Sequence, residues 1–75
     1  MEKGKKRNVI GRCLLGDILY KKAMTQVDLE IITGINKVQI NEFINNKRVM
    51  SLNNAKIISD ALNCLIEDLY EWKNN

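Results

Sequence analysis

The feature that most constrains this chain is the stretch 25–48, TQVDLEIITGINKVQINEFINNKR, in which a helical pattern stops at a glycine and then restarts. Thr25 has the side chain of a helix N-cap, and Asp28 stands three residues later, where its carboxylate can accept from the free N–H groups of a helix start. Gly34 ends the pattern, because glycine most readily adopts the left-handed backbone of a C-terminal cap. We therefore predict a helix over Gln26–Thr33.

A second helical pattern follows almost at once. Asn36 can cap this helix, with Gln39 three residues later, and apolar residues then recur at helical spacing at Ile40, Phe43 and Ile44. We predict a helix over residues 37–45. The two helices are too close in sequence to lie antiparallel with a relaxed loop between them. The spacing predicts a helix-turn-helix, a motif whose second helix enters the major groove of DNA.

The rest of the chain shows the same periodicity. A helix over residues 9–22 is predicted from the apolar stripe of Ile10, Leu14, Leu15, Ile18 and Leu19. Ser51 can cap a helix over Leu52–Leu62, whose predicted inward residues are Leu52, Ala55, Ile58, Ala61 and Leu62. A last helix is predicted over residues 66–72. The sequence has no proline and few aromatic residues, so we expect an all-α fold, a compact five-helix domain.

The charges are segregated along the chain. The formal net charge is +3, but residues 1–48 hold ten Lys/Arg and five Asp/Glu, whereas residues 49–75 hold two Lys and four acids. A basic first half suggests a polyanionic partner. Residues 1–8 form a predicted basic arm carrying Lys3, Lys5, Lys6 and Arg7, ahead of a single domain over residues 9–75. The arm is either a solubilising tail or a segment that lies along DNA phosphates or in a minor groove.

Several classes of function are not supported by the composition. There is no histidine, and Cys13 and Cys64 each lack a second cysteine at short spacing, so we predict neither a zinc site nor a Ser or Cys nucleophile with its usual base. No cofactor or metal is predicted, and we do not expect an enzyme. No apolar run is long enough to span a bilayer, and the basic start is not followed by a signal-peptide core. We expect a cytoplasmic protein.

Four segments occur in the order and at the spacing of one known family. They are Thr25-Gln26 with Leu29, the turn Thr33-Gly34-Ile35-Asn36 followed by Ile40, the loop Asn45-Asn46-Lys47-Arg48, and the ending Ile58-Ser59-Asp60-Ala61-Leu62-Asn63 with Glu67-Asp68-Leu69-Tyr70. This arrangement resembles the Cro/repressor-type domain of the Xre family. The resemblance implies a sequence-specific DNA-binding regulator, a repressor or a Cro-like protein, of phage or mobile-element origin. Such proteins generally bind double-stranded DNA as homodimers on operators with two-fold symmetry.

The resemblance also assigns roles to residues. The positions that match groove-facing residues, and so imply base contacts, are Lys37, Val38, Gln39, Asn41 and Glu42. The positions that imply phosphate contacts are Gln26, Asn36, Asn45, Lys47 and Arg48. Lys37 can donate to guanine, Gln39 or Asn41 can pair with adenine, and Val38 suits a thymine methyl. Glu42 either accepts from cytosine N4 or lies just outside the groove. Tyr70 and Trp72 either pack on the first helix or form dimer contacts.

Three positions depart from the family pattern. Leu19 and Ile44 stand where many members have an Arg–Glu pair, and an apolar pair can replace such an ion pair without loss of stability. Glu30 replaces a small residue between the two helices of the motif, and Leu65 replaces the usual cap of the last helix. Glu30, Glu42 and the acidic second half keep an alternative open, a protein-interaction module such as an antitoxin or adaptor. The sequence identifies neither the operator nor an inducer or antirepressor protein.

Overall fold

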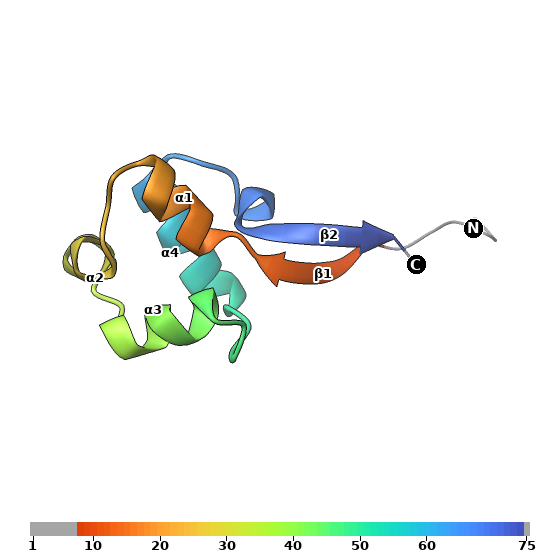
Figure 1. Ribbon diagram of the computed structural model, residues 1–75, viewed down its shortest axis with the longest axis horizontal. Helices are drawn as coiled ribbons and strands as arrows, with labels where there is room; N and C mark the ends of the chain where they lie inside the picture. The colour runs from red at the N-terminus through yellow and green to blue at the C-terminus, as the bar shows by residue number, and fades with distance from the viewer. Residues whose placement is uncertain (1–7, 75) are drawn as a thin grey trace.

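The computed structural model describes residues 8–74, in which four α-helices pack into one body beside a small two-stranded sheet (Figure 1). The helices are α1 (Leu15–Lys21), α2 (Gln26–Thr33), α3 (Lys37–Ile44) and α4 (Leu52–Leu62). A single 3₁₀ turn, η1 (Ile66–Leu69), leads into strand β2 (Tyr70–Asn74), which pairs with β1 (Asn8–Cys13). The sheet projects from the helical body along the long axis of the molecule. Among these residues no helix has the length and apolar character needed to cross a bilayer.

The helix-turn-helix prediction is confirmed. Thr25 Oγ1 accepts from Asp28 N at 3.0 Å while the Asp28 carboxylate accepts from Thr25 N at 2.9 Å, which closes the capping box of α2. Gly34 ends α2 with φ +75°, and its N–H donates to the carbonyl of Glu30. The second helix begins at Lys37 as predicted and ends one residue early, at Ile44.

The core lies where the helices meet. Its fully buried side chains come from every helical element and are Leu15, Leu29, Ile40, Phe43, Ile58, Ser59, Leu62 and Leu69. Leu52 was predicted to face inward in α4, and this is wrong, since it is 75% exposed. It is the first residue of α4, directly after the Ser51 cap, and the buried residues of that helix begin at Ala55.

The prediction of an all-α, five-helix domain is wrong at both ends of the chain. Strand β1 occupies the first part of the helix predicted over 9–22, and η1 with β2 replaces the helix predicted over 66–72. Asn8, assigned to the arm, belongs to β1, whereas the other arm residues, including Lys3, Lys5, Lys6 and Arg7, lie outside the described residues. Val9, Ile10, Tyr70 and Trp72 are β-branched or aromatic and favour strands, and two such segments can satisfy one another although they are distant in sequence.

The two strands are antiparallel and interrupted by a β-bulge. Ile10 lies opposite Trp72 and Cys13 opposite Tyr70, so two residues of β1, Gly11 and Arg12, face a single residue of β2. A Cβ at Gly11 would lie 3.1 Å from the Glu71 carbonyl oxygen, which explains a glycine there. The bulge turns Arg12 toward two carboxylates, Asp17 at 3.4 Å and Glu71 at 3.6 Å.

Several hydrogen bonds tie the sheet to the helical body. Cys13 N in β1 donates to Asn46 Oδ1, in the loop after α3, at 2.9 Å. Leu14 N donates to the carbonyl of Leu69 at 2.8 Å, where both strands leave the body. Met50 N donates to the Tyr70 hydroxyl at 3.0 Å in a buried site. Beyond Tyr70 every residue of β2 is exposed. The sheet is therefore anchored at one end only.

Candidate nucleic-acid interface

The first turns of α2 and α3 border a shallow hollow on the protein surface. It is lined by Thr25, Gln26, Val27, Lys37, Val38 and Asn41. The structure thus brings together four residues that the sequence assigned to DNA contact, and it adds Thr25 and Val27. Val27 is 45% exposed and Val38 66% exposed, although both are apolar. Val27 was missed because an apolar residue in an amphipathic helix is expected to face the core.

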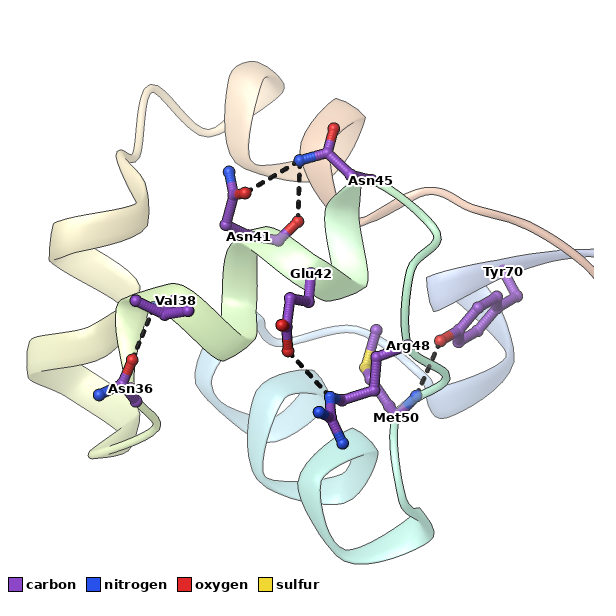
Figure 2. Close-up of polar contacts among 8 residues, drawn as sticks. All are labelled: Asn36, Val38, Asn41, Glu42, Asn45, Arg48, Met50 and Tyr70. Carbon is purple, nitrogen blue, oxygen red and sulfur yellow. Dashed lines mark hydrogen bonds and ion pairs between the residues drawn. The ribbon is translucent and has the colours of Figure 1, made fainter.

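A chain of side-chain amides holds Asn41 in this hollow. Asn41 Nδ2 donates to Gln26 Oε1 at 3.3 Å, which joins α3 to the start of α2. On the other side Asn45 Nδ2 donates to Asn41 Oδ1 and to the Asn41 carbonyl, each at 3.0 Å (Figure 2). The Gln26 amide nitrogen keeps its hydrogens for another acceptor. Gln26 is therefore placed to support α3 through its oxygen and to donate to a phosphate through its nitrogen.

Side-chain acceptors satisfy two of the N–H groups at the start of α3, those of Lys37 and Val38. Asn36 Oδ1 accepts from Val38 N at 2.7 Å (Figure 2), as an N-cap side chain does. Glu30 Oε2 accepts from Lys37 N at 3.1 Å. Glu30 therefore has a structural role for which the sequence offered no explanation: its carboxylate reaches from α2 to the positive end of α3. Glu30 Oε2 and Asn36 Oδ1 both bond to the backbone of α3. The side chain of Asn36 can therefore contact a phosphate only through its amide hydrogens.

Glu42 and Arg48 are directed toward one another. Glu42 Oε1 and Arg48 Nε lie 2.9 Å apart, and Figure 2 shows the pair on a different side of α3 from Asn41 and Asn45. Gln39 is half-buried and does not line the hollow. Of the five residues assigned to base contact, the structure places Lys37, Val38 and Asn41 together and Gln39 and Glu42 apart from them.

The carboxylates of the helix-turn-helix are all engaged within the protein. Residues 23–48 hold three Lys/Arg and three Asp/Glu, so this segment carries no net charge. Asp28 accepts from the start of α2, Glu30 from the start of α3, and Glu42 pairs with Arg48. Lys37 and Lys47 are exposed and have no carboxylate partner within residues 8–74. The charged side chains of this segment that have no such partner are therefore the two lysines.

Apolar packing holds α3 against α1. Leu19 is buried, and it lines a second surface hollow together with Gly16 and Ile44. A Cβ at Gly16 would lie 3.2 Å from Ile44 Cγ2, so the helices approach closely at this point. Leu19 and Ile44 thus border the same hollow, and this apolar packing leaves no buried charge to neutralise.

The two C-terminal aromatic residues have different environments. Tyr70 is buried, which favours packing within the protein among the two alternatives predicted for it, and burial raises the pKa of its hydroxyl. Trp72 is 44% exposed, and its indole N–H donates to the carbonyl of Glu67 at 2.9 Å. Burial also raises the pKa of the free thiols of Cys13 and Cys64, which disfavours the reactive thiolate.

Comparison with known proteins finds relatives that are also helix-turn-helix proteins. Residues 14–75 match the family model described as the Cro/C1-type HTH DNA-binding domain. The chain is 45% identical over 65 residues to the SPbeta prophage-derived uncharacterized HTH-type transcriptional regulator YopS of Bacillus subtilis, covering 85% of this chain and 88% of that protein. It is 32% identical over 59 residues to a second such regulator, YotL, covering 77% and 74%. The crystal structure of the transcriptional regulator VanUg has the same fold, with TM-score 0.66 at 20% identity, over 100% of this chain and 96% of that one.

Proposed function

The chain belongs to the Cro/C1-type helix-turn-helix DNA-binding domain family, and we propose that it is a sequence-specific transcriptional regulator of prophage type. Its helix α3 enters the major groove of DNA, and two copies of the protein occupy the two halves of an operator with two-fold symmetry. The protein acts in the cytoplasm and represses transcription by covering a promoter.

One observation supports this proposal above the others. Every carboxylate of residues 23–48 accepts a hydrogen bond from another group of the same chain. Lys37, Val38 and the amide of Asn41 are exposed around one hollow. A surface meant for DNA must not present free carboxylates to phosphates. Glu30, Glu42 and the acidic second half of the chain kept a protein-interaction module open as an alternative. The contacts that Glu30 and Glu42 make within the protein weaken the part of that alternative that rests on them.

The groups around the hollow suit base edges. The Lys37 ammonium can donate to guanine O6 or N7, and the Val38 methyls can contact a thymine methyl. Asn41 is held by Gln26 and Asn45, so it meets an adenine edge with little loss of side-chain freedom. Lys47 and the basic residues before α2 supply affinity that does not depend on sequence. Arg48 donates to Glu42 through Nε, so the terminal guanidinium nitrogens of Arg48 remain available to a phosphate.

The test is selection of tight-binding duplexes from a random pool, followed by fluorescence anisotropy on the selected duplex and on a scrambled one. Titrations at about 0.1 and 0.2 M salt separate specific binding from charge alone, because phosphate-driven binding weakens steeply over this range. We expect the selected sequence to contain an inverted repeat and to remain the tighter ligand at the higher salt. Equal affinity for both duplexes, or no binding to any, contradicts the proposal.

Two matched variants separate the roles of the lysines. Lys37→Ala lowers affinity for the selected duplex by about tenfold and relaxes preference at one position. Lys47→Ala weakens binding to both duplexes alike and lowers the salt slope by about one. Lys56→Ala is the control, because Lys56 lies on α4, where it pairs with Asp60, and we expect no change in DNA binding.

A further inference from the structure

Glu42 is joined to the loop after α3 by two hydrogen bonds. Its carbonyl accepts from Lys47 N at 2.9 Å, and Asn46, directly before Lys47, has φ +60°, so the helix ends in a Schellman motif. Its carboxylate oxygen Oε1 accepts from Arg48 Nε, also at 2.9 Å (Figure 2). The backbone of Glu42 therefore fixes Lys47, and the side chain of Glu42 fixes Arg48.

The backbone on both sides of Arg48 is tied to the rest of the protein. Before it, Asn46 Oδ1 accepts from Cys13 N in β1 at 2.9 Å. After it, Met50 N donates to the hydroxyl of the buried Tyr70 at 3.0 Å. The guanidinium group of Arg48 therefore extends from a loop whose position is set at two points.

The outer end of the Arg48 guanidinium group faces solvent. The Arg48 side chain is 56% exposed, and the hydrogen bond to Glu42 uses Nε. Nη1 and Nη2 donate to no acceptor within residues 8–74. An ion pair as exposed as this one adds little to folding stability. Two terminal nitrogens in one plane, however, match the spacing of two phosphate oxygens.

The pair continues the exposed side of α3 that begins at Val38. Residues four apart lie on the same side of a helix, so Glu42 follows Val38 one turn later. Val38 is exposed at the rim of the hollow that the proposed function places against DNA. A carboxylate on this side of α3 would repel phosphates unless a cation lay beside it. Arg48 is that cation.

We propose that Glu42 is a positioning residue for DNA binding: it holds Arg48 so that Nη1 and Nη2 meet one backbone phosphate beside α3. This inference rests on the proposed function, and it gives Glu42 a role other than the base contact predicted from the sequence. A long side chain loses conformational freedom when it binds, and an arginine that is already held loses less. The ion pair stays closed when DNA binds.

The proposal and charge alone predict opposite effects for one substitution. Glu42→Ala removes a negative charge from a surface that approaches phosphates, and charge alone would tighten binding. If Glu42 positions Arg48, the same substitution weakens binding by about fivefold, because Arg48 must then be ordered as DNA binds. Glu42→Gln keeps an oxygen that accepts from Nε, so its affinity stays within about twofold of the original protein. Arg48→Lys keeps the charge but has no Nε, and it weakens binding as Glu42→Ala does.

Fluorescence anisotropy on the selected and scrambled duplexes measures these effects. A phosphate contact does not depend on sequence, so we expect Glu42→Ala to weaken binding to both duplexes by the same factor. In an Arg48→Ala background, Glu42→Ala causes no further loss, since the group that it positions is gone. Asp60→Ala is the matched control, because it also removes the carboxylate of an exposed ion pair, with Lys56 on α4, and it should not weaken DNA binding. Circular dichroism checks that each variant is folded.

NMR of the arginine Nε–H groups tests the ion pair without DNA. Arg48→Lys identifies the Arg48 signal, which we expect to exchange slowly with water in the original protein and faster in Glu42→Ala. An exchange rate that Glu42→Ala leaves unchanged overturns the proposal. So does Glu42→Ala binding that is as tight as that of the original protein, or a loss confined to the selected duplex, which would mean a base contact. These three results leave the proposed function standing, whereas an original protein that binds no duplex overturns both.

Discussion

The α2–α3 unit and the β1–β2 sheet are built on opposite principles. In α2–α3 the contacts that define the elements are short in sequence: the caps at Thr25 and Asn36 bond within three residues, and Glu30 reaches Lys37 seven residues on. In the sheet each strand exists only because the other end of the chain lies beside it, as where Asn8 meets Asn74. The unit also packs on the core, whereas the sheet is anchored at one end. We therefore expect substitutions in the two regions to differ in their effect on the free energy of unfolding and in how far along the structure that effect extends.

The largest effect should come from the core beneath the helix-turn-helix. Phe43 in α3 is 1% exposed, and Phe43→Ala removes a buried aromatic side chain and leaves a cavity. We expect a loss of about 3–5 kcal/mol in the free energy of unfolding, measured by urea denaturation. Phe43→Leu keeps most of the volume and should cost less than about 1.5 kcal/mol. Equal losses of unfolding free energy for the two variants would show that stability does not depend on the volume filled at position 43.

The next effect concerns the link between the two regions. Tyr70→Phe removes the acceptor of the buried Met50 N–H, and we expect a cost of about 1–3 kcal/mol at neutral pH. Burial raises the pKa of Tyr70 in the folded protein, so the contribution of Tyr70 is complete below the unfolded pKa of about 10 and is lost as pH rises through the folded value. Urea denaturation at increasing pH should show the stability difference between the two proteins narrowing above about pH 10. A difference that widens there would contradict this assignment.

A smaller effect is expected at the contact between α2 and α3. Glu30→Ala leaves the N–H of Lys37 without its carboxylate acceptor and should cost about 1 kcal/mol, as the loss of a helix cap does. Glu30→Gln retains an oxygen acceptor and should recover most of that loss. Thermal unfolding followed by circular dichroism compares the two. If Ala and Gln are equivalent, the bond to Lys37 contributes nothing.

The smallest effect on global stability should be in the sheet. Gly11→Ala brings a methyl group to 3.1 Å from the Glu71 carbonyl oxygen, but the strands can shift because no core lies beyond Tyr70. We expect a change within about 0.5 kcal/mol in global unfolding, together with faster amide exchange in β1 and β2 only. Faster exchange in α3 as well would show that the two regions are coupled.

The difference between the regions also explains how far the sequence could be interpreted. The helix-turn-helix was predictable because caps, glycine and apolar spacing act within a few residues, and α2 has the predicted bounds. Residues 9–13 carry an apolar pattern that suits a helix or a strand equally, and only the facing strand decides between them. The polar character of the candidate interface was predictable from its residue types. The contacts between its side chains were not: Glu42 pairs with Arg48, and Asn41 bonds to Gln26 and Asn45.

The sequence by itself determined that two short capped helices meet at Gly34 and that an exposed row of Lys37, Val38 and Asn41 follows, because these depend on local backbone preferences and on helical periodicity. Only the tertiary structure decided that the two ends of the chain form a sheet, that Tyr70 is buried while Trp72 is exposed, and that Glu30 completes the start of α3. These outcomes depend on which distant groups come within bonding distance, and that distance is set by the packed fold rather than by residue order.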